Sequence, residues 1–319
     1  MATTITSTIK LPSGFEIPRL GFGVSIPSNI ISPIVALIQV SIKVYKTYET
    51  PPPQPPPHTG TPMERCCLEA LKAGYRHIDS AAIYKNEAGC GNAIRGSQIP
   101  REQIFFTSKV INISYDGAKA QIDESLALSK LNYIDLMLLH QPRGGSENRK
   151  GAWLALVEAV EAGKIRSIGV SNYGVHHLNE LEAYISKLET ERGGKGRGGI
   201  ISINQVELHP WLGRKDIAEW CTARGVFLEA YCPIVRGARF DEPSVKKLAD
   251  KYGKTPAQVL IRWSLDKGFI PLPKSVTPDR IVANADVFDF NLTGEEVRAL
   301  ETEEYSPVAW DPTVTRLDE

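Results

Sequence analysis

From residue 62 to residue 285, short apolar segments alternate with longer amphipathic segments, and this alternation allows very few folds. The apolar segments predict strands at residues 75–78, 104–110, 134–139, 165–170, 200–204, 226–230 and 269–272. The segments between them predict helices at residues 63–73, 86–95, 115–131, 150–162, 175–188, 215–224, 243–252, 256–266 and 279–285. Strands that are apolar on both faces and joined by helices form a parallel sheet that is covered on both sides.

The chain before this region adds one further strand. Residues 9–17 predict a small hairpin that turns at Pro12-Ser13-Gly14, and residues 19–24 predict an apolar strand. The resulting eight strands favour a (β/α)8 TIM barrel, which forms one domain at a length of 319 residues. A doubly wound sheet is the alternative, but no Gly-x-Gly-x-x-Gly follows an early strand and opens a helix. We therefore expect a single barrel domain over residues 1–319 with an N-terminal β-hairpin.

Charge and cysteine usage argue against several classes of function. Lys and Arg together number 37 and Asp and Glu number 37, so no overall field attracts nucleic acid or an anionic membrane. The five cysteines show no metal-ligand spacing, and their scatter is typical of a reducing compartment. Residues 1–10 lack the basic-then-apolar pattern of a signal peptide. We expect a cytoplasmic protein with no metal and no nucleic-acid or membrane partner.

Polar or ionisable side chains stand where the predicted strands end. These residues are Asp79, Lys109, His140, Ser171, Asn172, Gln205, Tyr231 and Lys274. In a barrel the carboxyl ends of all strands open on one mouth, so these side chains converge there. Each of them alone has an ordinary structural interpretation, such as a turn cap, a solvated lysine or a hydrogen-bonded core histidine. Their occurrence together predicts a reaction site, to which the loop after residues 75–78 returns Tyr84.

Six segments resemble motifs of the aldo-keto reductases and occur in that family's order. They are residues 74–87 (GYRHIDSAAIYKNE), 107–110 (TSKV), 138–142 (LLHQP), 163–172 (GKIRSIGVSN), 204–210 (NQVELHP) and 272–275 (LPKS), the last followed by Arg280 and Asn284. The resemblance covers residues 11–23 and 62–307. It implies a TIM barrel whose C-terminal tail, residues 305–319 with Trp310, closes over the active-site mouth.

The resemblance also implies a reaction, in which NADPH delivers a hydride to the carbonyl carbon of an aldehyde or ketone. Tyr84 would donate a proton to the developing alkoxide, and His140 would orient the carbonyl oxygen. A free tyrosine has a pKa near ~10 and is a poor acid at neutral pH. The expected role of Lys109 is to lower that pKa through its ammonium charge, and the expected role of Asp79 is to hold Lys109 in place.

Cofactor positions carry over residue by residue from the resemblance. It assigns the nicotinamide carboxamide to Ser171, Asn172 and Gln205, and the stacking position on the ring to Tyr231. It assigns the adenosine 2′-phosphate to Lys274, Ser275 and Arg280, and the adenine to Asn284. Two cations at one point favour NADPH over NADH, because a phosphate dianion pairs well with Arg and Lys. We expect NADPH/NADP+ as the cofactor and a small-molecule carbonyl compound as the substrate.

Residues 24–61 depart from the family's pattern as an atypical insertion. Residues 30–44 are mostly apolar without a period, and residues 51–57 are a proline-rich spacer. Val24-Ser25 can be encoded by GTAAGT, a typical intron donor, so we hypothesise that residues 24–43 derive from a retained intron. The rival interpretation is a real lid at the first β-to-α loop, which could gate or block the site.

Three functions stay open at this point. The first is an NADPH-dependent carbonyl reductase, serving sugar, aldehyde-detoxification or secondary-metabolite chemistry. The second is a non-catalytic NADPH-binding regulatory module, since some barrels of similar sequence are regulatory subunits. The third is a product inactivated by the insertion. Proteins similar to this one are commonly monomers, so we expect a monomer.

Overall fold

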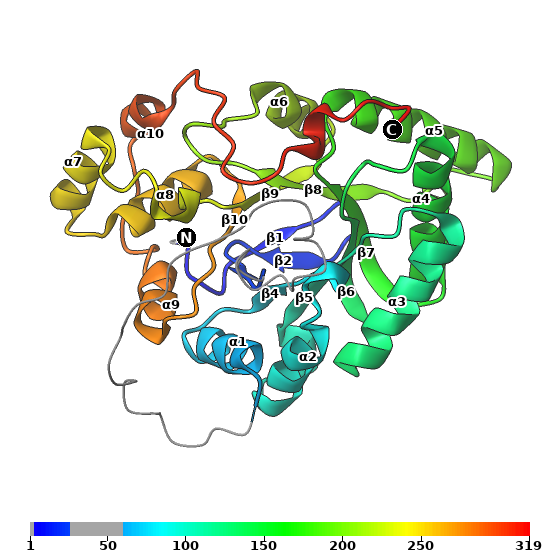
Figure 1. Ribbon diagram of the computed structural model, residues 1–319, viewed down its shortest axis with the longest axis horizontal. Coiled ribbons are helices and arrows are strands. Elements are labelled where there is room, and N and C mark those ends of the chain that lie inside the picture. The colour runs from blue at the N-terminus through cyan, green and yellow to red at the C-terminus, as the bar shows by residue number, and fades with distance from the viewer. Residues whose placement is uncertain (1–2, 26–59) are drawn as a thin grey trace, which may run out of the picture.

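Eight parallel strands form the centre of the computed structural model, which describes residues 3–25 and 60–319 (Figure 1). The strands lie side by side in chain order, so each strand pairs with the next along the sequence. They are β3 (Phe22–Gly23), β4 (His77–Asp79), β5 (Phe105–Val110), β6 (Ile134–Leu139), β7 (Ile165–Ser171), β8 (Ile201–Glu207), β9 (Phe227–Tyr231) and β10 (Ile270–Leu272). This arrangement confirms the (β/α)8 prediction.

The first and last strands meet, which nearly closes the sheet into a barrel. The amide of Gly21 donates to the oxygen of Pro271 at 3.1 Å, and the amide of Gly23 donates to the oxygen of Pro273 at 3.1 Å. A side chain on Gly21 would collide with Leu272, and its Cβ would lie 2.6 Å from the Nδ1 of His77. Glycine is therefore required at this seam, since only a residue without Cβ allows such a close approach.

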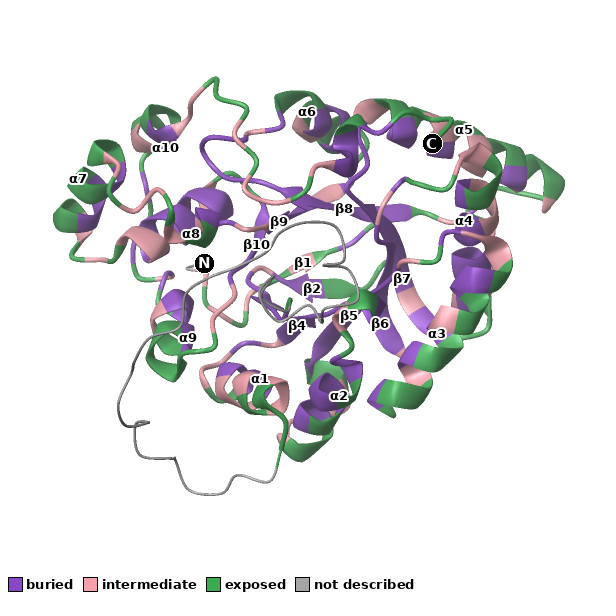
Figure 2. Ribbon diagram, in the orientation of Figure 1, coloured by how far each residue is buried: buried purple, intermediate pink, exposed green. Residues whose placement is uncertain are grey.

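Helices cover the outside of the barrel, with their buried faces turned inward (Figure 2). They are α1 (Pro62–Lys72), α2 (Glu87–Gly96), α3 (Tyr115–Ser129), α4 (Ser146–Glu161), α5 (Val175–Glu191), α6 (Lys215–Ala223), α7 (Pro243–Tyr252), α8 (Pro256–Asp266), α9 (Pro278–Ala285) and α10 (Gly294–Leu300). Side-chain oxygens of Thr61, Ser114, Thr255 and Thr293 cap the first turns of α1, α3, α8 and α10. Within the described ranges no helix is long and apolar enough to cross a membrane.

The predicted hairpin is present and closes the N-terminal end of the barrel. Its strands β1 (Thr8–Lys10) and β2 (Glu16–Pro18) pair antiparallel, and the turn between them places Gly14 at φ 91°. Leu11 and Ile17 pack against apolar side chains inside the barrel, including Phe105 and Leu138. The hairpin thus seals the end of the barrel that lies opposite the expected mouth.

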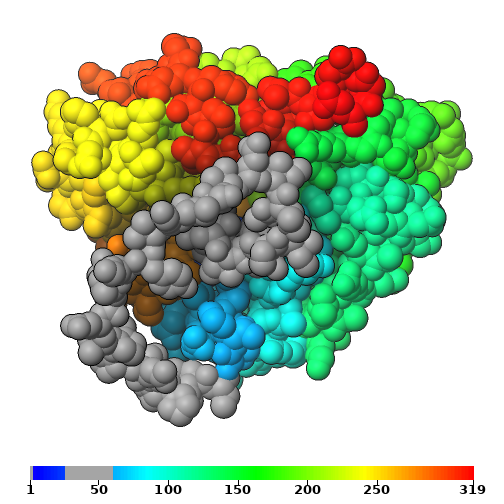
Figure 3. Space-filling model, viewed as in Figure 1, coloured from blue at the N-terminus to red at the C-terminus, as the bar shows by residue number. Residues whose placement is uncertain are grey.

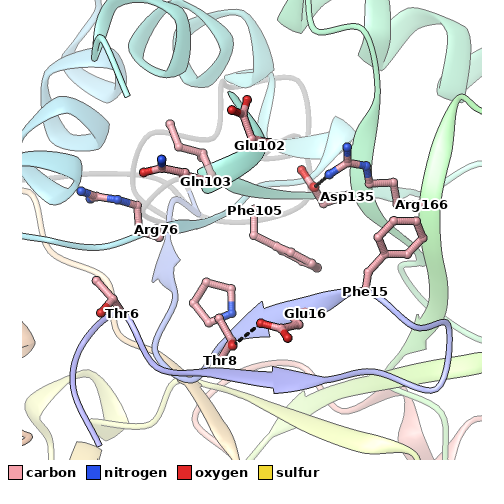
Figure 4. A pocket seen from close by; sticks show the side chains of 12 residues that line it. Thr6, Thr8, Phe15, Glu16, Arg76, Glu102, Gln103, Phe105, Asp135 and Arg166 are labelled. Carbon is pink, nitrogen blue, oxygen red and sulfur yellow. Dashed lines mark hydrogen bonds and ion pairs between the residues drawn. The ribbon is translucent and has the colours of Figure 1, made fainter. Parts of the chain in front are cut away.

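A cavity of about 420 Å³ lies between this hairpin and the adjoining strands (Figure 4). Its lining includes Phe15, Glu16, Arg76, Phe105 and Arg166. These side chains surround the N-terminal ends of the strands, so the cavity lies away from the expected reaction site. In a barrel this end contributes to stability, whereas chemistry is found at the other end.

Several predicted boundaries differ from the observed ones, and one α-helix of the described chain was not predicted. Helix α4 begins four residues before the predicted start at residue 150, and strand β8 runs three residues past the predicted end at residue 204. Only Phe22 and Gly23 of the predicted strand at residues 19–24 pair as strand β3. Helix α10 was missed because its single apolar stripe, Val297 and Leu300, is too short to show a period. The hypotheses on the insertion concern residues 24–61, of which 26–59 lie outside the described residues.

Candidate active site

A buried ion pair lies at the carboxyl ends of β4 and β5. Asp79 is the last residue of β4 and Lys109 is the penultimate residue of β5, and both residues are buried. The Nζ of Lys109 donates to Asp79 Oδ1 at 2.8 Å, to Asp79 Oδ2 at 2.9 Å and to the main-chain oxygen of Ser80 at 2.6 Å. An ammonium carries three hydrogens, so these bonds fix both the position and the direction of the Lys109 side chain.

Lys109 keeps its positive charge despite its burial. Burial lowers the pKa of an ammonium, but the neighbouring Asp79 and Tyr84 more than offset this, and the pKa of Lys109 is raised. The site therefore contains a permanent cation in a dry environment. Such a cation acts on its neighbours far more strongly than it would in water.

The Tyr84 side chain lies beside this cation. A short 3-10 helix, η2 (Ala82–Tyr84), follows β4 and places the Tyr84 ring centre 5.5 Å from Lys109 Nζ. Burial raises the pKa of the Tyr84 phenol, and the ammonium of Lys109 lowers it. The effect of Lys109 has the expected sign, but burial outweighs it, so the pKa of Tyr84 is raised. Dehydration is the physical reason, since it disfavours a phenolate.

His140 follows β6 and completes the group. Its ring centre lies 5.7 Å from that of Tyr84, with the two rings nearly perpendicular. Burial holds the pKa of His140 well below its usual value, and the charge of Lys109 adds to this effect. His140 is therefore a neutral imidazole, and its Nδ1 has no hydrogen-bond partner among the described residues. A neutral imidazole carries one N–H, which can be donated to a carbonyl oxygen.

A second cluster, Ser171, Asn172, Gln205 and Tyr231, lies beside the first. Tyr231 donates its hydroxyl to Asn172 Oδ1 at 2.8 Å, and Asn172 Nδ2 donates to the main-chain oxygen of His140 at 3.0 Å. Ser171 Oγ donates to the main-chain oxygen of Gln205 at 2.8 Å. Gln205 Nε2 donates to Asp79 Oδ2 at 2.9 Å, which connects this cluster to the ion pair. The structure thus brings together eight of the twelve residues predicted for the site.

The other four lie after β10 and along α9. Lys274 and Ser275 follow β10, while Arg280 and Asn284 are one turn apart on α9. Within the described residues neither Lys274 nor Arg280 takes part in a salt bridge, and burial lowers the pKa of the half-buried Lys274. Two cations that have no counterion among the described residues, at a helix N-terminus, provide a favourable position for a phosphate group. These residues therefore fit the 2′-phosphate of NADPH.

Backbone strain is concentrated in the loops at the same end of the barrel. Eight residues other than glycine have positive φ angles within the described chain. Six of them lie in loops that follow barrel strands, namely Lys85, Asn172, Arg214, Cys232, Val235 and Arg236. A left-handed conformation is costly for a β-branched residue such as Val235 at φ 51°. Strained residues of this kind cluster at functional sites.

The C-terminal tail lies against the mouth, as expected. The ring of Trp310 is 6.1 Å from that of His140, and the main-chain oxygen of Trp310 is 3.4 Å from the hydroxyl of Tyr231. Figure 3 shows the tail in orange to red along the surface of the barrel face that is turned to the viewer. The tail is attached by Glu207, whose carboxylate accepts the amides of Val308 and Ala309 at 2.7 and 3.1 Å.

Sequence reasoning missed three charged residues in this region. Two of them, Glu207 and Arg214, hold the tail, and Arg214 does so through a 2.8 Å bond to Asp311. The third, Glu229, lies inside the barrel below Gln205. A signal for Glu229 was present, because it is the one ionisable residue in the apolar strand predicted at residues 226–230. It lies two positions before Tyr231 and so faces the same side of the strand.

Comparisons with known proteins agree with this geometry. The sequence profile of the aldo/keto reductase family matches residues 64–303. The glyoxal reductase of Bacillus subtilis is 37% identical over 301 residues, which cover 93% of this chain and 92% of that protein. The methylglyoxal reductase DkgA of Escherichia coli is 36% identical over 293 residues, which cover 91% of this chain and 91% of that protein.

Solved structures show the same similarity. An aldo/keto reductase from Brucella melitensis superposes with a TM-score of 0.74 at 34% identity, covering 92% of this chain and 98% of that chain. An aldo-keto reductase from Bombyx mori, solved in complex with NADP, superposes with a TM-score of 0.76 at 28% identity and covers 97% of this chain and 96% of that chain.

Proposed function

The chain belongs to the aldo/keto reductase family, and from this premise we propose that it reduces the carbonyl group of an aldehyde or ketone with NADPH. The observation that carries the proposal is the Lys109 ammonium, bonded to Asp79 at 2.8 Å and lying 5.5 Å from the ring centre of Tyr84. A fixed cation beside a phenol is an arrangement that stabilises a phenolate, and a phenolate forms when tyrosine donates its proton.

In this proposal the protein supplies the proton and stabilises the developing charge. NADPH, when bound, supplies the hydride to the carbonyl carbon. Tyr84 transfers its proton to the alkoxide oxygen, and the phenolate that remains is stabilised by Lys109. His140, neutral because of its burial, donates a hydrogen bond to the same oxygen and so orients the carbonyl group.

The raised pKa of Tyr84 is compatible with this role. It ensures that the phenol is protonated before the reaction at any pH near neutrality. The proton is transferred only when negative charge develops on the substrate oxygen, because the alkoxide is then the stronger base. The raised pKa also reduces the phenolate fraction of the resting protein.

We propose that the cofactor is held by the two groups of side chains described above. Ser171, Asn172 and Gln205 would bind the carboxamide, and Tyr231 would stack on the ring. Lys274, Ser275 and Arg280 would bind the 2′-phosphate, and Asn284 would bind the adenine. The absence of salt bridges to Lys274 and Arg280 within the described residues supports the phosphate assignment.

For the substrate we propose a small, reactive aldehyde. Two relatives that cover most of the chain are named for the reduction of glyoxal and methylglyoxal. These names favour aldehyde detoxification over sugar or secondary-metabolite reduction among the pathways left open by the sequence. Trp310 beside His140 provides an apolar wall for such a molecule.

We also propose that the protein is a cytoplasmic monomer. Its five free cysteines support a reducing compartment.

The test follows the oxidation of NADPH with methylglyoxal in three proteins, namely the wild type, Tyr84→Phe, and a variant that lacks residues 24–43. We expect turnover by the wild type, and a fall of about 10²-fold or more in Tyr84→Phe. Activity in the deletion variant alone would mean that the insertion inactivates the site. NADPH binding without turnover in every protein would contradict the proposal and favour the regulatory module.

A further inference from the structure

Glu229 is a carboxyl group in the barrel interior that the proposed mechanism does not use. It lies on β9 with no exposed surface, beside Gln205 on β8. Its Oε2 accepts a hydrogen bond from Gln205 Nε2 at 2.6 Å, and the same nitrogen donates to Asp79 Oδ2 at 2.9 Å. One amide group therefore bridges two carboxyl groups directly below the site.

Among the described residues, the interior beside Glu229 contains too few cations for both carboxyl groups to be ionised. All three hydrogens of Lys109 are taken by Asp79 and the oxygen of Ser80, so none is left for Glu229. His77 is the other basic group near Glu229 in the described part of the chain, and its Nε2 is 3.7 Å from Glu229 Oε1 but 2.9 Å from the hydroxyl of Thr107. Burial lowers the pKa of His77 to about 3, so that ring is neutral.

Glu229 therefore retains its proton. Its Oε1 has no hydrogen-bond partner among the described residues, which is costly for a carboxylate but much less so for a neutral acid. Burial raises the pKa of Glu229 to about 8, and the charge of Asp79 acts in the same direction. The two carboxyl groups thus differ in state because only Asp79 has the ammonium.

The bridge also fixes the orientation of the Gln205 amide. Both hydrogens of its nitrogen point to carboxyl oxygens, so its own oxygen is left as an acceptor. A flipped amide would place its oxygen 2.9 Å from the negative charge of Asp79. The Gln205 oxygen is therefore available to the N–H of a carboxamide, which is the group that we propose Gln205 to bind.

We propose that Glu229, in its protonated form, is a positioning residue for carbonyl reduction. It orients Gln205 toward the cofactor. Because Glu229 is neutral, the positive charge of Lys109 acts on Asp79 and Tyr84 and is not shared with a second carboxylate. Loss of its proton adds a second negative charge next to Asp79, which stabilises the protonated phenol and opposes proton donation by Tyr84. This inference rests on the function proposed above.

Two variants of Glu229 separate its effect on the orientation of Gln205 from the effect of its charge. Glu229→Gln keeps an acceptor for Gln205 and cannot ionise, so we expect kcat and the Kd of NADPH within about threefold of the wild type at neutral pH. We expect kcat/KM of the wild type to fall as the pH rises through about 8 and this fall to be absent in Glu229→Gln. Glu229→Leu removes the acceptor, and we expect the Kd of NADPH to rise about tenfold.

A wild-type alkaline fall that persists in Glu229→Gln would overturn the proposal. So would a Glu229→Leu variant that binds NADPH as tightly as Glu229→Gln, since a merely structural residue would alter thermal stability alone.

A direct test of the protonation state of Glu229 needs no turnover. The infrared difference spectrum of wild type minus Glu229→Gln should contain a carboxylic-acid C=O band at neutral pH, and its absence would contradict a protonated Glu229. This spectrum decides the inference even if the reductase proposal fails.

Discussion

At the scale of single residues, the site shows how position decides the chemistry of one functional group. Asp79 and Glu229 share the nitrogen of Gln205, yet only Asp79 contacts the ammonium of Lys109. A buried carboxyl group with a cation ionises, and one without a cation keeps its proton. The same principle explains why the rings of His140 and His77 are neutral, because burial beside the Lys109 cation lowers the pKa of both.

Replacing Lys109 with Met tests the cation. We expect kcat to fall by about 10²-fold or more, because the Tyr84 phenolate loses its stabilising charge. We also expect the free energy of unfolding to fall by about 3–5 kcal/mol, since Asp79 becomes a buried charge without a counterion. The control is the double variant Lys109→Met/Asp79→Asn, which should recover stability but not kcat. Recovery of kcat in the double variant would contradict the role given to Lys109.

Glu229 should also affect the pH dependence of stability. Its pKa is raised from 4.5 to about 8 in the folded protein, so the folded state binds the proton more tightly than the unfolded state. The free energy of unfolding of the wild type should therefore fall, relative to Glu229→Gln, as the pH rises from about 4.5 to about 8. Urea unfolding of both proteins across this range measures the difference. A difference that does not change with pH would exclude a raised pKa.

At the scale of elements, the predicted helix starts and strand ends agree with the observed ones to within one residue, except for the start of α4 and the end of β8. Polar residues after apolar runs identified Asp79, Lys109 and His140, and all three lie at the mouth. The start of α4 was placed too late because Ser146–Glu161 begins with a polar turn that lacks a periodic apolar stripe. Gly145, which precedes it, forms no side-chain cap that a sequence pattern could reveal.

The loop after β10 and the start of α9 should discriminate between the two nicotinamide cofactors. We expect Arg280→Met to raise the Kd of NADPH about tenfold, because one charge-assisted bond to the 2′-phosphate is lost. The Kd of NADH should not change. Lys246→Met serves as a matched control, since Lys246 is an exposed lysine on α7 that pairs with Asp241. Equal weakening of both cofactors, measured by fluorescence titration, would contradict the phosphate assignment.

At the scale of the whole molecule, the barrel could be predicted because its pattern is local. Each strand and helix carries its own periodicity, and short connections leave few topologies. The Glu229–Gln205–Asp79 bridge joins β9, β8 and β4, and the tail contact joins Glu207 to Val308. Such contacts depend on register across the barrel, which no local pattern specifies. The assignments of roles to the site residues remain predictions.

The central claim is that this barrel transfers a hydride from NADPH to a carbonyl carbon. The most direct measurement uses NADPH deuterated at C4 of the nicotinamide ring, with methylglyoxal as the substrate. We predict that the alcohol formed by the wild type carries deuterium on its new C–H carbon, and that Tyr84→Phe binds NADPH but forms little of this product. Tight NADPH binding by the wild type with no deuterated alcohol would contradict the account.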